Sequence, residues 1–230
     1  MKRYKWFRIS LPIDLQLLLD RLNSNPFLGD VDFGFGFVAG SGGRIRFRYY
    51  RRVKLVVGFV DERGDPANRL IDSIESFEFE FISSNGLLII RIDDPPRSIK
   101  SLLDRLERAC GEGFSVELMT FPFDCHQIIL SGPKSTRLIA LKGAGADRRR
   151  NYVARVEVAS REGIVLEHLT VLRGLDFSIE NSTYEVITNE GKGQVAFLAS
   201  GVVRFSDQIA DSLLVAFEGY LLDGNEHGRL

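Results

Sequence analysis

Arg44-Ile45-Arg46-Phe47-Arg48-Tyr49-Tyr50-Arg51-Arg52-Val53-Lys54 is the stretch that decides the fold class, because its basic and apolar residues alternate with a period of two. Successive side chains of an extended strand leave opposite faces, so Ile45, Phe47 and Tyr49 share one face and the arginines between them share the other. The first face suits a hydrophobic core, and the second presents a row of guanidinium groups to an anionic ligand. The stretch therefore predicts a β-strand with one buried face.

Further strands are predicted on both sides of this stretch. In the first half they are expected at residues 6–11, 44–50, 53–61, 74–83, 87–92 and 114–119. Asn85-Gly86 accepts positive φ and predicts a tight hairpin between two of them. In the second half strands are expected at residues 128–130, 138–141, 151–158, 177–187, 194–199 and 202–205.

Four segments have apolar residues at helical spacing, which predicts amphipathic helices. They are residues 14–23, 98–110, 162–172 and a last segment that starts at Ser206 or Asp207 and ends at Leu222. Both halves thus show a strand, a helix, several strands and a final helix. Ser73-Ile74-Glu75 and Ser178-Ile179-Glu180 are local echoes of this order. The pattern favours a duplicated α+β unit, and the alternative is one mixed domain whose hairpins look alike.

The segment Phe197-Leu198-Ala199-Ser200-Gly201-Val202-Val203-Arg204-Phe205 resembles the strand, Ser-Gly turn and strand of the TATA-binding proteins and their relatives. Residues 81–90 look like a second copy of the segment. The resemblance implies an α+β protein of two similar halves, each a curved antiparallel sheet packed by one or two helices. Residues 1–122 are expected to form the first half, and residues 123–230 the second half with a short polar tail.

Composition is that of a globular protein with no excess of charge, since the formal net charge is −1 over 230 residues. Any contact with nucleic acid must therefore use a local basic patch. No apolar run approaches the roughly 20 residues that span a bilayer, so we expect a cytoplasmic protein without membrane contact. Cys110 and Cys125 fit no common metal motif and are expected to be free thiols. No metal and no cofactor is expected.

The leading functional interpretation is a non-enzymatic protein that binds nucleic acid through basic strand and loop residues on a sheet face. Spaced arginines on a sheet contact phosphates, and neighbouring aromatic rings stack on bases. The candidate residues are Arg44, Arg46, Arg48, Arg51, Arg52 and Lys54, together with Arg148, Arg149 and Arg150 in a second basic region.

The sequence contains a competing explanation for the same row. Glu75, Glu78 and Glu80 alternate at the same period as the arginines. If the strand that carries them pairs with the arginine strand, cross-strand ion pairs neutralise the row.

Two other functions stay open. The 17 phenylalanines and the near-neutral charge suit a protein–protein interaction subunit, adaptor or homo-oligomer. The opening Phe7-Arg8-Ile9-Ser10-Leu11-Pro12 is similar to that of RNA-processing enzymes with duplicated ferredoxin-like domains. No catalytic residue is predicted, because neither His126 nor His168 has the sequence context of a general base. Gly34-Phe35-Gly36-Phe37-Val38 is similar to the centre of an RNA-recognition motif, but we favour the explanation that it is a glycine-punctuated aromatic core strand.

Overall fold

The structure is a computed structural model that describes residues 1–147, 152–169 and 176–223. The chain is an α+β protein whose strands form one large, largely antiparallel sheet. It divides into two compact units, which we call the first unit (Phe7–Glu117) and the second unit (Met1–Trp6 with Leu118–Leu230). Strand β1 begins in the second unit and ends in the first.

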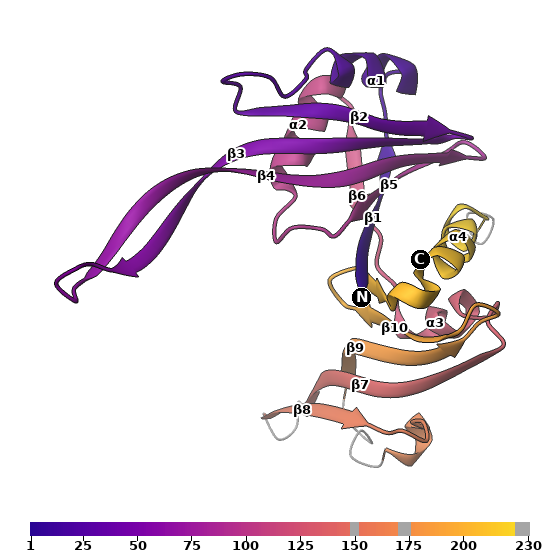
Figure 1. Cartoon of the computed structure of the whole chain (residues 1–230). Helices are drawn as coiled ribbons and strands as arrows, with labels where there is room; N and C mark the ends of the chain where they lie inside the picture. Colours follow the sequence, from indigo (N-terminus) through magenta and orange to yellow (C-terminus); the bar gives the residue numbers. More distant parts are fainter. Residues whose placement is uncertain (148–151, 170–175, 224–230) are drawn as a thin grey trace. The chain divides into compact units, whose positions relative to one another are not determined.

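The first unit contains the two longest strands of the described residues (Figure 1). Its elements are β1 (Lys2–Ser10), α1 (Leu15–Asn23), β2 (Phe33–Ser41), β3 (Arg44–Val60), β4 (Pro66–Ser84), β5 (Leu87–Asp93), α2 (Lys100–Cys110) and β6 (Ser115–Leu118). The strand order is β2-β3-β4-β5-β1, and β6 also pairs with β1. Without β2 and β3, the order β1-α1-β4-β5-α2-β6 is the βαββαβ order of a ferredoxin-like unit.

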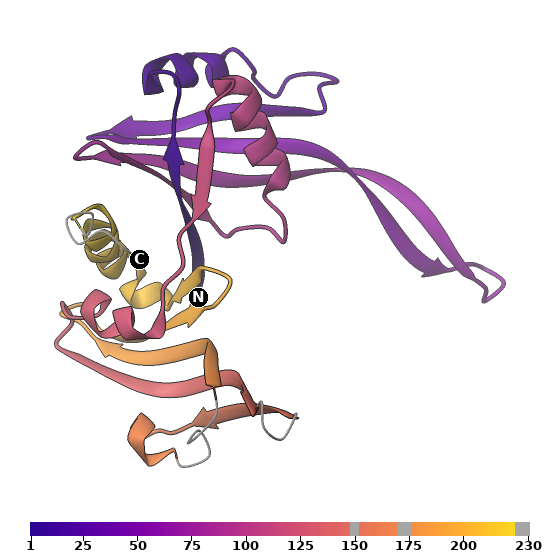
Figure 2. The same cartoon turned by 180° about the vertical axis from the view of Figure 1, so that it is seen from behind.

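Helices α1 and α2 cover one face of this sheet because their apolar stripes match its apolar face. Leu18 and Leu22 of α1 and Leu102 and Leu106 of α2 are fully buried. They pack in one cluster with alternate residues of the strands, among them Phe47. Figure 2 shows α2 lying across this face. The period of two that the opening stretch predicts is therefore confirmed on its apolar side.

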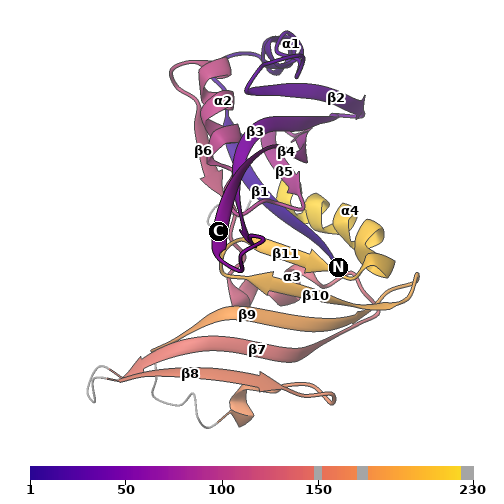
Figure 3. The ribbon, with the colours of Figure 1, turned by 60° about the vertical axis from the view of Figure 1, so that its left-hand side comes forward.

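The second unit is a sheet in the order β1-β11-β10-β9-β7-β8, and Figure 3 shows its outer strands side by side. Its other elements are the short 3₁₀ helices η1 (Phe123–Cys125) and η2 (Leu166–His168), α3 (His126–Ile129), β7 (Ser135–Asp147), β8 (Tyr152–Ala159), β9 (Asp176–Ile187), β10 (Lys192–Leu198), β11 (Val202–Phe205) and α4 (Asp207–Asp223). Trp6 lies 4.7 Å from the Phe217 ring of α4 and donates a hydrogen bond to Glu218 at 3.2 Å.

Several sequence predictions are confirmed. The hairpin at Asn85-Gly86 has positive φ at both residues, 51° and 77°. The cysteines are free, and burial raises the pKa of Cys110 to about 11.

The predicted strand at 128–130 is wrong, because His126–Ile129 forms the short helix α3. Of the helix predicted at 162–172, the described residues contain only η2.

The predicted duplication is not confirmed. The first unit has two helices between its strands, whereas the second unit keeps its long helix, α4, until after the last strand. The coarser part of the expectation, an α+β protein built on antiparallel strands, is confirmed.

Candidate functional site

The arginine row of β3 faces glutamates on β4. In the antiparallel register of the two strands, Arg46 stands opposite Glu80, Arg48 opposite Glu78 and Arg51 opposite Glu75. The alternative that the sequence offered, cross-strand Arg–Glu ion pairs that neutralise the arginine row, is thus confirmed.

The paired side chains are close enough to neutralise each other. Glu80 accepts hydrogen bonds from Arg44 at 3.1 Å and from Arg46 at 3.4 Å. Arg48 donates to Glu78, and this hydrogen bond is the main reason that the pKa of Arg48 is raised. Opposite charges directly across two strands stabilise a sheet, so this part of the row contributes to the fold.

The row continues into a buried ion network on β5. Arg91 and Glu80 are only 2% and 6% exposed, and their charged atoms lie 3.1 Å apart. Arg91 also donates to Asp93 at 2.7 Å. Burial, the largest influence, raises the pKa of Asp93. A buried charge is tolerated only when it is paired, so Glu80 and Asp93 both help to compensate the buried charge of Arg91.

The other predicted site residues have separate surroundings. Arg51 donates to Ser101 of α2 at 3.0 Å as well as to Glu75. Arg52 donates to the Val31 carbonyl at 3.0 Å. Lys54 stands opposite Asp72. The second predicted region, residues 148–150, lies outside the described residues, so the structure brings together only the β3 part of the predicted site.

Strands β3 and β4 continue far beyond the rest of the first-unit sheet. The last pair of β2 with β3 is Phe33 and Arg51, and the last pair of β4 with β5 is Phe79 and Ile92. Residues 53–60 of β3 and 66–73 of β4 pair only with each other. We call these residues and the turn between them the arm, which projects from the first-unit sheet (Figures 1 and 2).

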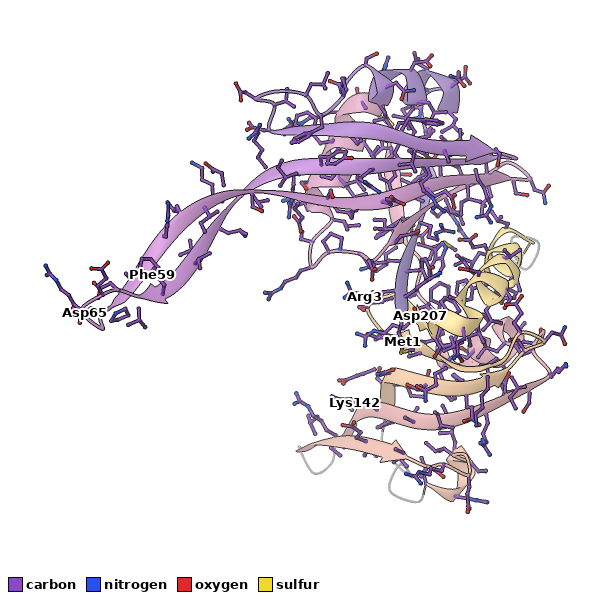
Figure 4. The ribbon with its side chains drawn as sticks, in the orientation of Figure 1. Met1, Arg3, Phe59, Asp65, Lys142 and Asp207 are labelled. Carbon is purple, nitrogen blue, oxygen red and sulfur yellow. The ribbon has the colours of Figure 1, made fainter. Side chains whose placement is uncertain are left out.

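The tip of the arm is an ordered turn. Asp61 accepts hydrogen bonds at 2.9 Å from the backbone amides of both Arg63 and Asp65. The Asp61 amide also donates to the Asp65 carbonyl at 2.9 Å, and Gly64 supplies the positive φ that the turn needs. Phe59 and Asp65 mark this end of the arm in Figure 4. The arm is therefore a complete hairpin with a defined end.

One face of the arm continues the core face of the first unit. Phe47 and Tyr49 of β3 are buried under the helices, and Leu55, Val57 and Phe59 follow at the same parity. These three side chains are 48%, 42% and 46% exposed. The apolar pattern of the strand thus persists where no helix of its own unit covers it.

The opposite face of the arm is apolar as well. Val56 stands opposite Leu70, and the two side chains are 66% and 67% exposed. Val60 near the tip is 68% exposed. A monomeric protein rarely exposes adjoining apolar side chains on both faces of one element, and such surfaces mark interaction sites.

The charges of the arm balance closely. Residues 53–73 contain three basic and four acidic side chains. The basic ones are Lys54, Arg63 and Arg69, and the acidic ones are Asp61, Glu62, Asp65 and Asp72. A surface without an excess of positive charge has no electrostatic attraction for a polyanion.

The two histidines considered as catalytic groups have different surroundings. His126 is 2% exposed, and its ring stacks on Phe197 at 3.9 Å. Its Nε2 lies 2.8 Å from the Phe121 carbonyl oxygen, so that nitrogen carries the proton, and Nδ1 accepts from the Ser182 hydroxyl at 3.1 Å. Burial lowers the pKa of His126, which is a neutral structural group. His168 is exposed at the end of η2.

A cavity of about 510 Å³ lies in the second unit. Arg137, Glu162 and Tyr184 are among its lining residues. Arg137 is paired with Glu185, and burial raises the pKa of Tyr184 to about 12. These two side chains therefore give the cavity neither an unpaired cation nor a group poised for proton transfer near neutral pH.

The arm is the candidate functional feature that sequence reasoning missed. The signal was present in Leu55-Val56-Val57, where three consecutive apolar residues make both faces of a strand apolar.

No helix in the described part of the chain is long and apolar enough to cross a membrane. No protein-family model and no curated protein matches this chain.

Proposed function

We propose that this chain is a non-enzymatic subunit of a protein assembly and that it docks on a protein partner through the arm. The observation that carries the proposal is the apolar strip at Leu55, Val57 and Phe59, which continues the core face of β3 beyond the cover of α1 and α2. An element patterned for a core, yet lacking a cover within its own unit, is suited to be completed by another chain.

The energetics favour a covered arm. An isolated two-stranded hairpin is at best marginally stable in water. Seven large apolar side chains of the arm are between 42% and 68% exposed, and complete burial of such a side chain is worth about 1.5–3 kcal/mol. Covering the half that is still exposed therefore gains about 1 kcal/mol for each residue that a partner contacts.

Nucleic acid is the competing ligand, and the charges of the described residues support it less. The guanidinium groups of Arg44, Arg46 and Arg48 are paired with Glu78 and Glu80. Affinity for nucleic acid comes mainly from cations that neutralise phosphates, so paired arginines on the sheet and a charge-balanced arm favour a protein partner.

The RNA-processing enzyme is the weakest of the three hypotheses. The βαββαβ order of the first unit agrees with its ferredoxin-like architecture. Fold alone is no evidence of activity, and His126 is buried with both ring nitrogens engaged.

Photo-crosslinking from the arm tests the proposal. A photo-reactive amino acid replaces Phe59 in one variant and Leu28, a 67% exposed residue of the same unit, in a control variant. After irradiation in cells and nuclease treatment, we expect a protein adduct from position 59 and none from position 28. A nucleic-acid adduct at position 59, or no adduct there, would contradict the proposal.

A further inference from the structure

We propose that the partner of the arm is the arm of a second copy of this chain, paired antiparallel through the outer edge of β3. The inference rests on the docking function proposed above and names its occupant. Three properties of the arm support it: the chemistry of its two edges, the self-complementarity of β3, and the separation of charge between its base and its tip.

The two edges of the arm differ. Residues 53–60 of β3 are Val-Lys-Leu-Val-Val-Gly-Phe-Val, an apolar strand with one charge and no proline. The facing strand carries Pro66, Arg69 and Asp72. Charges and proline on an edge strand hinder pairing with another chain, whereas an unprotected apolar edge offers its free N–H and C=O groups to one. Strand addition is therefore expected on β3.

The sequence of β3 is complementary to itself in an antiparallel register centred on Val57. In that register Leu55 of one arm stands opposite Phe59 of the other, and Val57 stands opposite its own copy. Residues directly opposite in antiparallel strands point to the same face, so the apolar strips of the two arms join into one surface. Aliphatic–aromatic cross-strand pairs of this kind stabilise a sheet.

Charge selects the antiparallel arrangement. The tip carries Asp61, Glu62 and Asp65 with a single arginine, whereas the base of the arm carries Arg52 and Lys54 with a single acid, Asp72, opposite Lys54. Antiparallel arms bring the acidic tip of each copy level with the basic base of the other, while parallel arms set like charges side by side. Opposite charges attract and fix the register, and the resulting two-fold contact closes at a dimer.

Sedimentation of the full chain tests this arrangement. A strand-edge contact is a small interface, so association is measured over roughly 1–100 µM. We expect a monomer–dimer equilibrium for the unaltered chain. Val57→Lys sets two lysines against each other at the two-fold axis, beside the Arg69 that faces position 57, and we expect this variant to remain monomeric. Val57→Glu is expected to weaken the dimer less, because Arg69 offsets its charge.

Mixing the two variants gives the decisive result. An equimolar mixture of Val57→Lys and Val57→Glu is expected to form a dimer at least as readily as Val57→Glu alone, because opposite charges then meet at the axis. Val215→Glu changes a 66% exposed valine outside the arm, and this control is expected to dimerise like the unaltered chain. Far-UV circular dichroism checks that each variant is folded.

Three results would overturn the homodimer. They are an unaltered chain that stays monomeric at 100 µM, a dimer unaffected by Val57→Lys, and a mixture of the two variants that does not associate. In each of these cases, a crosslink from Phe59 to a different protein would leave the docking function standing. A failure of the crosslink to reach any protein would remove both proposals.

Discussion

The inner and outer halves of the β3–β4 pair are built from the same two strands but are completed differently. In the inner half, residues 44–51, the charged face meets glutamates and the apolar face is covered by α1 and α2. In the outer half, residues 53–60, both faces are largely apolar and exposed. One strand thus contributes a structural segment and a candidate docking segment. The two segments differ because α1, α2 and the glutamates of β4 contact only the inner one.

The largest expected effect is on the free energy of unfolding, when one phenylalanine is replaced by alanine in each half. Phe47 and Phe59 lie on the same strand and face but are 0% and 46% exposed. Phe47→Ala is expected to lower the free energy of unfolding by about 3–5 kcal/mol, as a cavity in a core does. Phe59→Ala is expected to lower it by less than about 1 kcal/mol. Urea unfolding below 1 µM measures both, and equal losses would refute the comparison.

A second effect separates buried from exposed ion pairs within the inner half. Glu80→Gln removes one of the two acidic partners named above for the buried Arg91 and should cost about 3 kcal/mol. Glu78→Gln is the matched control, because its partner Arg48 is 44% exposed, and it should cost less than about 1 kcal/mol. The two variants are compared by urea unfolding. Similar losses of unfolding free energy in the two variants would mean that the buried Glu80–Arg91 pair does not stabilise the arginine row more than an exposed pair does.

His126 of the second unit gives a pH dependence of stability that does not involve either half of the β3–β4 pair. Burial lowers the pKa of His126 in the folded state, so the unfolded chain binds the proton first as the pH falls below about 6.5. Stability of this unit should therefore fall toward acid, by at most about 1.4 kcal/mol per pH unit. Fluorescence of Trp6, the single tryptophan, reports it. His126→Gln should flatten the dependence, and an unchanged slope would contradict this assignment.

The smallest expected effect concerns polyanions. Because the arginines of the inner half are paired, the chain should bind a heparin resin weakly at low salt, and replacing Arg48 with alanine should hardly change the elution salt. Strong retention that falls with Arg48→Ala, and steeply with salt, would instead support the nucleic-acid hypothesis.

Sequence reasoning predicted the inner half well. The alternation in residues 44–50 identified the strand and its apolar face, and Glu75, Glu78 and Glu80 indicated the paired arrangement as an alternative. The choice between free and paired arginines required the register of two strands about 30 residues apart. Register depends on where the connecting turn lies, and the period of either strand does not reveal that position.

The outer half was predicted only in part. The strand was expected to end at Asp61 and the next to begin at Ile74, whereas β4 begins at Pro66. Pro66, Asn68 and Asp72 have low strand propensity, so residues 66–73 do not read as a strand. Their pairing with β3 overrides the local preference. Within the first unit, Phe7–Glu117, no helix covers the arm, and this is a property of the fold that local sequence does not show.

Hydrogen exchange of the arm tests the central claim most directly. Backbone amides of residues 53–60 on the free edge of β3 are expected to exchange at least tenfold more slowly at about 100 µM than at about 1 µM, because a second chain then accepts their hydrogen bonds. Amides of residues 44–51, which lie between β2 and β4, should exchange equally slowly at both concentrations. Equal exchange of residues 53–60 at the two concentrations would contradict the pairing of arms.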